Sequence, residues 1–519
     1  MTQLGNRESK IEPRIRPLAQ VGFFSAVALN AAGAMVVEIT AGRLLAPYFG
    51  MSLYTWTTII GIVLAGLTVG HWLGGALADR FSSTLKRTIA LAFWAGALIT
   101  LAILPITRFV ALAMTEQQNP LATSIVVTSL AAFLLPSFAA GVIQPLATTY
   151  VIQRCEDQKG HFIGRMLAAG AFGSILGTFL AGFVLISYIG SAGSIWIVAG
   201  ANALFGALFF MKPVVRFFGL VVGIGMGYAA LSGWRVSVFA TPCQVESQYY
   251  CIRIDPADHM TGRSSRLMAL DHLVHSINDE QDPGHLASPY VHFVDEIARQ
   301  KFGAEPFSAF FIGGGGYTLP RAWVARHPDI RMFIAEIDPK VTLLAKKKLW
   351  FEPRDGVVVA NLDARFALAS QKPWQKYDVI FGDAFHDIAV PAHLITDEFY
   401  RLVAERLTDR GFYILNLVDD PRRPRLLASV LRTMQKQFKK VEIWGAPDDL
   451  GGAQRGTFIL YASKRVSGLP AKYLARNGQP RLWWRIGIQL ERVERLGVML
   501  TDDFAPVDRL LSRLWLRAD

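Results

Sequence analysis

Charged side chains are scarce in the first half of this 519-residue chain. Residues 1–240 hold 15 of the 53 Lys and Arg residues and 7 of the 41 Asp and Glu residues. Together with an apolar content of 52%, this excludes a disordered chain and disfavours an ordinary soluble enzyme. Only 3 cysteines are present, which excludes a disulfide-rich scaffold. The net charge of +12 resides in basic loops and a slightly basic second half, so no nucleic-acid partner is predicted.

What the first half has instead is long apolar runs. Each is about 20 residues or longer, which is enough for a helix to cross about 30 Å of hydrocarbon. They predict a multi-pass membrane domain of about seven helices over residues 20–235, after a basic tail over 1–19. The fourth run contains Pro136 and Pro145, which predict a kinked or re-entrant segment. The runs cover residues 20–42, 54–78, 88–107, 121–150, 166–188, 193–211 and 214–233.

Basic residues are distributed unevenly over the loops between these runs. The N-terminal tail and every second loop hold 12 Lys and Arg residues, and the alternate loops hold only Arg43 and Arg108. This bias predicts that the N-terminus lies in the cytoplasm. Seven spans would put the second half outside, and one miscounted span would reverse this. Cys243 and Cys251 suit a disulfide in an extracytoplasmic domain, or are two unrelated thiols. The side of the membrane on which the second half lies is therefore left undecided by the sequence.

Two ionisable residues lie inside predicted spans. Glu38 and His71 are functional-site candidates because a charge in hydrocarbon is costly unless it is paired or hydrated. The alternative is a satisfied packing pair, or an ion pair between Glu38 and Arg43. The segment 74–80 between the second and third runs resembles the cytoplasmic loop signature of major facilitator transporters.

The second half has the composition of a soluble α/β domain. Residues 242–290 alternate in polarity and predict a small antiparallel β unit. Over 291–465, strands alternate with helices, which predicts a parallel sheet of Rossmann-like, methyltransferase type. A buried strand runs into Gly313–Gly316, where glycines allow a ligand to approach the backbone. A dinucleotide fingerprint would need another glycine where Thr318 stands, so NAD is disfavoured.

Acidic residues follow successive predicted strands. Glu336 lies about 20 residues beyond the glycines, where such folds bind a ribose hydroxyl group. Asp363 and Asp383 follow the next two strands. The carboxyl ends of parallel strands form the ligand crevice of an open α/β sheet, so the series predicts a nucleoside site.

With these motifs, residues 244–465 resemble the spermidine synthase (polyamine aminopropyltransferase) family in its membrane-fused bacterial form, with an N-terminal major-facilitator-like membrane domain. The resemblance implies a transferase that moves an aminopropyl group from decarboxylated S-adenosylmethionine to a polyamine such as putrescine. It implies that this donor is a co-substrate and that no cofactor is bound permanently. The positions that match the donor site are Gly313, Gly314, Gly315, Glu336, Asp363 and Ala364.

The resemblance also implies a catalytic and an acceptor site. Asp383 matches the catalytic aspartate at the start of the family's Asp-x-x-Asp-Pro segment. The positions that correspond to the acceptor site are Tyr290, Asp271, His275 and Asp387.

Several positions depart from the family pattern. The acid that would hold the aminopropyl ammonium is replaced by Gly316, the second acid after Asp383 is displaced to Asp387, and His275 stands where the family has glutamine. The alternatives are therefore a methyltransferase that uses S-adenosylmethionine, or a non-catalytic protein that binds or transports polyamines. The acceptor amine and the oligomeric state stay open, with a homo-oligomer as one option.

Two further features concern the soluble half. Its histidines lack a tight ligand spacing, so no metal site is predicted. Residues 466–519 form a predicted C-terminal extension in which the segment 482–486, with Arg492 and Arg495, indicates an aromatic and basic amphipathic helix. This helix would lie on the membrane face or pack on the protein itself.

Overall fold

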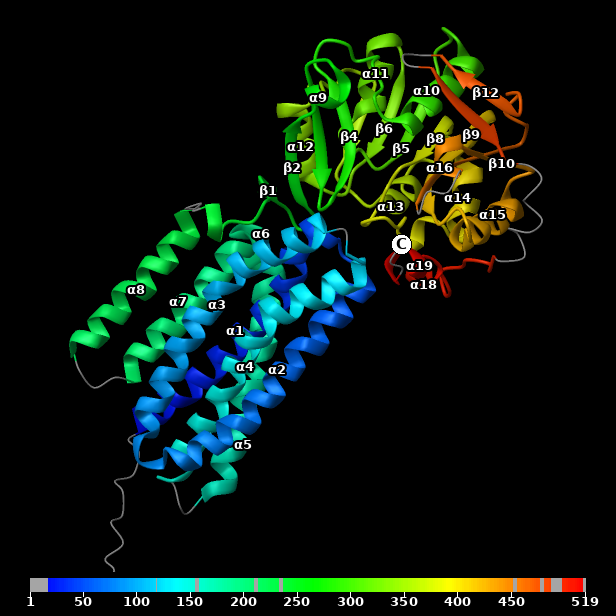
Figure 1. The fold of residues 1–519 in the computed structure, drawn as a ribbon. Coiled ribbons are helices and arrows are strands. Elements are labelled where there is room, and N and C mark those ends of the chain that lie inside the picture. Colours follow the sequence, from blue (N-terminus) through cyan, green and yellow to red (C-terminus); the bar gives the residue numbers. More distant parts are fainter. Residues whose placement is uncertain are drawn as a thin grey trace, which may run out of the picture. The chain divides into compact units, whose positions relative to one another are not determined.

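The computed structural model divides the chain into two compact units. One unit comprises Met1–Tyr48, Tyr54–Asn119 and Thr123–Thr241, and the other comprises Phe49–Leu53, Pro120–Ala122 and Pro242–Asp519. The structure describes residues 17–117, 119–154, 158–209, 213–232, 237–450, 455–476, 480–486 and 497–516. Figure 1 shows the elements of both units.

The first unit consists of helices. Within the described residues, seven helical spans are long and apolar enough to cross a membrane, as the sequence predicts. The fourth predicted run is one continuous helix through both prolines, so it is not re-entrant. The elements are α1 (Pro17–Phe49), α2 (Leu53–Arg80), η1 (Ser82–Thr84), α3 (Leu85–Glu116), α4 (Leu121–Ile152), α5 (Lys159–Phe179), the π-helical η3 (Leu180–Leu185), α6 (Ile186–Tyr188), α7 (Gly190–Phe209) and α8 (Pro213–Ser232).

Glycines bring several of these helices into close contact. A side chain at Gly70 of α2 would collide with the backbone of Phe138 in α4, and one at Gly173 of α5 would collide with Ala28 in α1. Small residues allow this close approach of the helix backbones, which is typical of helices that pack within a membrane.

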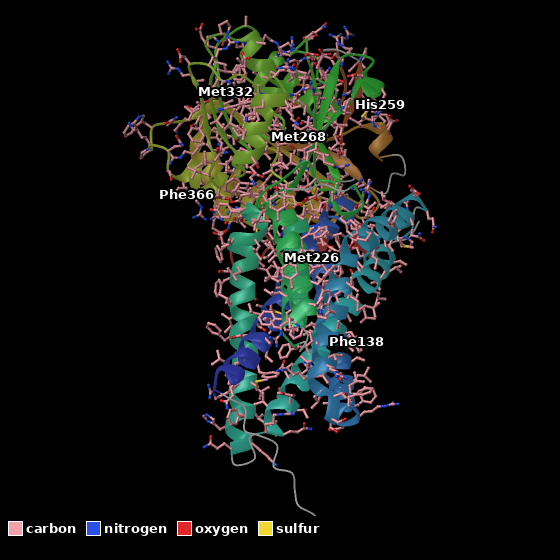
Figure 2. All side chains as sticks on the ribbon, turned by 90° about the vertical axis from the view of Figure 1, so that its left-hand side faces the viewer. Phe138, Met226, His259, Met268, Met332 and Phe366 are labelled. Atoms are coloured by element: carbon pink, nitrogen blue, oxygen red, sulfur yellow. A yellow bond between two sulfur atoms is a disulfide. The ribbon has the colours of Figure 1, made fainter. Side chains whose placement is uncertain are left out.

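Large apolar side chains also cover the outside of the helical unit. Trp72 on α2 is 76% exposed and Phe183 in η3 is 70% exposed. Figure 2 shows the side chains along the helices, where the labelled Phe138 and Met226 are half-buried. Exposed apolar surface of this extent marks a surface that contacts a membrane or another protein.

The second unit begins with a small antiparallel sheet in the order β1-β2-β3-β4, as the sequence predicts. Its strands are β1 (Val245–Glu246), β2 (Cys251–Pro256), β3 (Ser265–Leu270) and β4 (Leu273–Asp279). A disulfide joins Cys243, just before β1, to Cys251 at the start of β2. Of the two alternatives left open by the sequence, the structure therefore has the disulfide.

A nine-stranded sheet follows, in the order β12-β13-β10-β11-β9-β8-β5-β6-β7. Its central strands from β7 to β9 are parallel, and those beyond β9 pair antiparallel. The strands are β5 (Ser308–Ile312), β6 (Arg331–Ala335), β7 (Val357–Ala360), β8 (Tyr377–Gly382), β9 (Leu407–Asp419), β10 (Lys440–Gly445), β11 (Gly456–Ser463), β12 (Lys472–Ala475) and β13 (Arg481–Arg485).

Helices connect these strands, which gives the predicted α/β fold. The strand order reverses between β5 and β8, because β6 and β7 lie on one side of β5 and β8 lies on the other. Such a switch point opens a crevice at the carboxyl ends of the strands. The helices are α9 (Asp258–Thr261), α10 (Pro289–Phe302), α11 (Thr318–Arg326), α12 (Pro339–Lys348), α13 (Ala364–Ala369), η5 (Ala392–Leu394), α14 (Asp397–Arg406), α15 (Arg425–Gln437), α16 (Pro447–Leu450), α18 (Val507–Leu510) and α19 (Ser512–Leu516).

The sheet continues past residue 465, where the sequence predicts a separate extension. The prediction of an amphipathic helix is wrong at 481–485, because these residues form strand β13. Trp483 is buried there and stacks on Phe293 of α10 at 4.4 Å between ring centroids. Its apolar ring therefore belongs to the core of the unit. Arg492 and Arg495 lie outside the described residues.

Candidate active site

The glycine loop after β5 lies at the switch point of the sheet. Gly313 has φ of 95°, a conformation that favours glycine, and a Cβ there would lie 2.8 Å from the carbonyl oxygen of Asp383. The amide of Asp383 donates to the carbonyl of Ile312 over 2.9 Å. The loop after β5 and the residue after β8 are thus held side by side at the carboxyl edge.

Glu336 follows β6 and is nearly fully buried against the glycine loop. Its Oε2 accepts hydrogen bonds from the amides of Gly314 (2.8 Å) and Gly315 (3.2 Å), and its Oε1 accepts from the amide of Asp338 (2.9 Å). Burial is the main cause that raises the pKa of Glu336, against these hydrogen bonds. A carboxylate offers about four lone-pair sites, so acceptor capacity remains for a ligand hydroxyl.

Asp383 receives hydrogen bonds from two different elements. The hydroxyl of Tyr290, in the first turn of α10, donates to Oδ2 over 3.2 Å. The amide of Asn416, on β9, donates to Oδ1 over 2.9 Å. The sequence-predicted pair Asp383 and Tyr290 is therefore brought together, in a geometry that fixes both carboxylate oxygens.

The surroundings of Asp383 favour its neutral form. Burial raises the pKa of this carboxyl group to about 7, and the hydrogen bonds from Asn416 and Tyr290 oppose that rise. Burial and the neighbouring carboxylate also raise the pKa of Tyr290, so its hydroxyl stays a donor. A carboxylate with a pKa near 7 is suited to exchange a proton with a substrate at neutral pH.

Asp363 and Ala364 follow β7. Asp363 caps α13 by accepting from the amide of Phe366 (3.0 Å), and its Oδ2 lies 2.8 Å from Nε2 of His393. The hydrogen bond from His393 is the main cause that lowers the pKa of Asp363. The carboxylate is thus ionised and partly exposed at the end of its strand.

The remaining predicted residues gather at the turn between β3 and β4 and in the loop after β8. Asp271 is buried, and its Oδ1 accepts from the amide of Cys251 over 2.9 Å. Nδ1 of His272 lies 3.2 Å from Oδ1 of Asp387. Burial, with Asp271 as the next cause, raises the pKa of Asp387 to about 8, and burial lowers that of His275 to about 4. Asp271 and Asp387 are therefore close to one another, and Asp387 is partly uncharged at neutral pH.

Known proteins resemble this chain, although no family model matches it. A polyamine aminopropyltransferase of Vibrio vulnificus is 34% identical over 129 residues, which cover 25% of this chain and 42% of that protein. A polyamine aminopropyltransferase of Corynebacterium efficiens is 24% identical over 435 residues, which cover 79% of each protein. The chain is similar to polyamine aminopropyltransferases. The resemblance given by the sequence motifs is thereby confirmed.

A solved structure is also similar. The crystal structure of a probable spermidine synthase from Corynebacterium glutamicum has 21% sequence identity, and the match covers 51% of this chain and 97% of that one with a TM-score of 0.44. The chain spans less than half the length of its Vibrio vulnificus relative.

Two residues of the aminopropyltransferase-like site were missed by sequence reasoning. Asn416 is a lone amide within the apolar strand β9, and this break in the pattern was an available signal. Tyr250 donates its hydroxyl to the carbonyl of Phe385 over 3.0 Å, in the loop after Asp383. Nothing in the alternation around Tyr250 indicates a contact 135 residues away.

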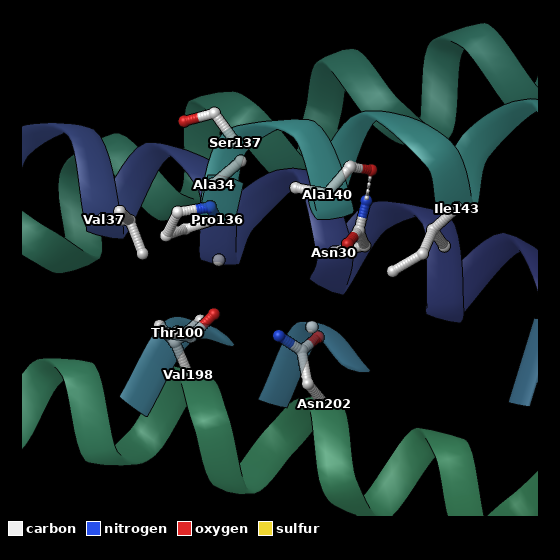
Figure 3. Close-up of a pocket in the computed structure, with 12 residues that line it drawn as sticks. Asn30, Ala34, Val37, Thr100, Pro136, Ser137, Ala140, Ile143, Val198 and Asn202 are labelled. Carbon is white, nitrogen blue, oxygen red and sulfur yellow. Dashed lines mark hydrogen bonds between the residues drawn. The ribbon is translucent and has the colours of Figure 1, made fainter. Parts of the chain in front are cut away.

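The membrane-domain candidates lie elsewhere. Glu38 is partly buried on α1 and His71 is exposed on α2. Neither residue lines the cavity in the helical unit that Figure 3 shows, which includes Asn30, Thr100 and Asn202. This cavity measures about 20 Å³, which is room for about one water molecule.

Proposed function

We propose that the chain is a membrane-bound aminopropyltransferase that uses decarboxylated S-adenosylmethionine and an acceptor such as putrescine. The observation that carries this proposal is the Asp383 carboxylate, fixed by Tyr290 and Asn416 beside the glycine loop. The similarity to polyamine aminopropyltransferases supports it.

The donor would occupy the crevice along the ends of β5, β6 and β7. Gly313, Gly314 and Gly315 would approach its methionine-derived part, and Glu336 would accept from the ribose hydroxyl groups. Asp363 and Ala364 would contact the adenine. The unused acceptor capacity of Glu336 and the partial exposure of Asp363 support these roles.

In the reaction, an amine nitrogen attacks the carbon next to the donor's sulfonium. The C–N bond forms, the C–S bond breaks and methylthioadenosine leaves. The proton of the attacking amine passes to Asp383, whose pKa of about 7 suits a base at neutral pH. The ionised carboxylate also attracts the cationic amine.

The rest of the acceptor would extend toward the second group of acids. Asp271, His275 and Asp387 are proposed to hold the distal part of the amine. A bound ammonium would favour the ionised form of Asp387, whose pKa is about 8 without it. Acceptor binding and ionisation of Asp387 would therefore be coupled.

A methyltransferase is the second candidate, and Gly316 favours it. The residue carries no carboxylate to hold an aminopropyl ammonium, and a side chain there would collide with Ser276. Mass spectrometry of the amine after incubation with each donor separates the two reactions. We expect an aminopropyl adduct from decarboxylated S-adenosylmethionine. A methyl adduct from S-adenosylmethionine alone would show that the protein is a methyltransferase.

We propose the bacterial inner membrane as the location, with the N-terminus in the cytoplasm. Seven apolar helices support a multi-pass chain in contact with lipid. With this odd number the soluble unit would be extracytoplasmic, where the Cys243–Cys251 disulfide would persist. The proposed likeness of the helices to major facilitator transporters stays a prediction, as do transport by the helices and a homo-oligomer.

A further inference from the structure

A disulfide closes the segment that enters the small sheet. Cys243 and Cys251 are both buried, and their bond ties together the two ends of the segment 243–251, which we call the clasp. Ser247 orders its interior, because its Oγ accepts from the amides of Tyr249 (3.0 Å) and Tyr250 (2.8 Å). The clasp is therefore a compact loop whose ends are covalently fixed.

The clasp contacts both sides of the proposed acceptor site. The backbone of Cys251 makes two hydrogen bonds with Asp271: its amide donates to the side-chain Oδ1 over 2.9 Å, and its carbonyl accepts from the Asp271 amide over 2.8 Å. The neighbouring Tyr250 donates to the carbonyl of Phe385 over 3.0 Å. Phe385 lies between Asp383 and Asp387, so one disulfide-linked segment holds two separate parts of the site.

The strained backbone of these partners makes the support necessary. Asp271 has φ of 54° and Asp387 has φ of 62°, a region that residues other than glycine adopt at an energetic cost. Such conformations persist only where surrounding contacts fix them. For Asp271 these contacts include its two hydrogen bonds to Cys251, and for the loop of Asp387 they include the one from Tyr250.

We propose that the Cys243–Cys251 disulfide is a redox-dependent positioning device for the acceptor site. When it is intact, the clasp holds Asp271 and the loop 383–387 in place for the amine. A dithiol reductant supplies two electrons and two protons, becomes a cyclic disulfide and leaves two thiols on the protein. The released ends then loosen Tyr250 and Asp271, and acceptor binding weakens. This inference rests on the proposed function.

The first test is kinetic, on the full-length protein in detergent. Dithiothreitol is expected to raise the KM for putrescine about tenfold, the effect of losing one or two buried hydrogen bonds, with a smaller change in the KM for the donor. Without reductant, the double variant C243S/C251S should already show the raised KM for putrescine of reduced wild type. Dithiothreitol should not change it further. The variant C155S, at the remaining cysteine, should respond as wild type does.

The variant Y250F tests whether the clasp acts through the loop. It keeps the disulfide but removes the hydroxyl that donates to Phe385. If both changes act on the same contact, reduction should raise the KM of Y250F for putrescine less than that of wild type. If reduction raised the KM for putrescine by the same factor in Y250F and in wild type, this route would be contradicted.

A second readout does not depend on activity. The amides of His386 and Ala389 each donate to the other's carbonyl, and their hydrogen exchange should accelerate on reduction. Amides of the β10–β11 pair serve as the internal control and should not change. Unchanged exchange in 384–389 would overturn the proposal. So would loss of protection throughout the α/β unit, since the disulfide would then only stabilise the fold.

These readouts separate the two proposals. If wild type transfers no aminopropyl group but exchange in 384–389 responds to reduction, the clasp stands and the proposed function fails. If transfer occurs and neither KM nor exchange responds to reduction, the function stands and the clasp proposal fails.

Discussion

The hydroxyl of Tyr290 and the carboxylate of Asp383 meet at 3.2 Å, although 93 residues separate them in the chain. Tyr290 lies in the first turn of α10 and Asp383 directly after β8, at the switch point of the sheet. Asn416 completes the arrangement from β9. The proposed chemistry depends on this carboxylate.

The pH dependence of catalysis should follow Asp383. As a base it must be ionised, and burial raises its pKa to about 7. We expect kcat/KM for the amine to fall as the pH drops below about 7, with a slope of about one decade per pH unit. Steady-state rates between about pH 5.5 and 8.5 measure this profile. A flat profile through pH 6 would exclude Asp383 as the base.

The two hydrogen-bond donors should set that pKa. Both hydrogen bonds lower the pKa of Asp383, so removal of either donor should raise it further. The variants N416L and Y290F should therefore move the acid limb of the kcat/KM profile to higher pH. Rates at high pH should recover toward the wild-type value in N416L. A limb that stays in place in both variants contradicts the assigned contacts.

Donor binding should depend on Glu336. In E336Q one oxygen becomes an NH₂ group, which cannot accept from the loop amides or from a ribose hydroxyl. We expect the KM for decarboxylated S-adenosylmethionine to rise about tenfold and the KM for putrescine to change little. The matched control is E352Q, at an exposed glutamate in a loop. Equal effects in both variants would remove Glu336 from the donor site.

The side of the membrane can be read with C-terminal fusions. Seven spans from a cytoplasmic N-terminus place the C-terminus outside. Alkaline phosphatase fused after Asp519 should be active, and green fluorescent protein at the same place should be dark. The reverse pattern would mean that the soluble unit is cytoplasmic, where the Cys243–Cys251 disulfide would be kept reduced.

The pH dependence of thermal stability should reveal the burial of Asp383 without any measurement of catalysis. Its folded-state pKa of about 7 exceeds the ordinary value of 3.8, so the folded state binds the proton more tightly. The associated stability is complete below about pH 3.8 and is lost as the pH rises through about 7. The melting temperature of D383N minus that of wild type should increase as the pH is raised from 6 to 8. A difference that does not change with pH would contradict the raised pKa.

Sequence patterns predict the periodic parts of this molecule well. The seven apolar runs and the glycine loop before Thr318 depend on local hydrophobicity and chain geometry, which neighbouring residues reveal. The sequence predicts a helix instead of strand β13 because the aromatic residues Trp483 and Trp484 stand beside the basic Arg485, a composition that also suits an amphipathic helix. The strand pairs with β12 and β10, and the ring of Trp483 stacks on Phe293, almost 200 residues away in the chain.

The site was predictable only in part, for a related reason. Acids at strand ends converge because the parallel sheet brings those ends together, so Glu336 and Asp383 could be found. The hydrogen bond from Tyr250 to Phe385 depends on how the small sheet packs on the large one, which no local pattern encodes. Asn416 was predictable in part. A buried amide in an apolar strand needs a hydrogen-bond partner, but the sequence does not show which residue that partner is.

The most direct test of the account is methylthioadenosine release by the purified full-length protein. Wild type and D383N would be compared with decarboxylated S-adenosylmethionine, with and without putrescine and other amines. We predict release by wild type that requires an amine, and a rate about 10²- to 10⁴-fold lower in D383N with the fold intact. Equal amine-dependent rates in both proteins, or no release by wild type with any amine, would contradict the account.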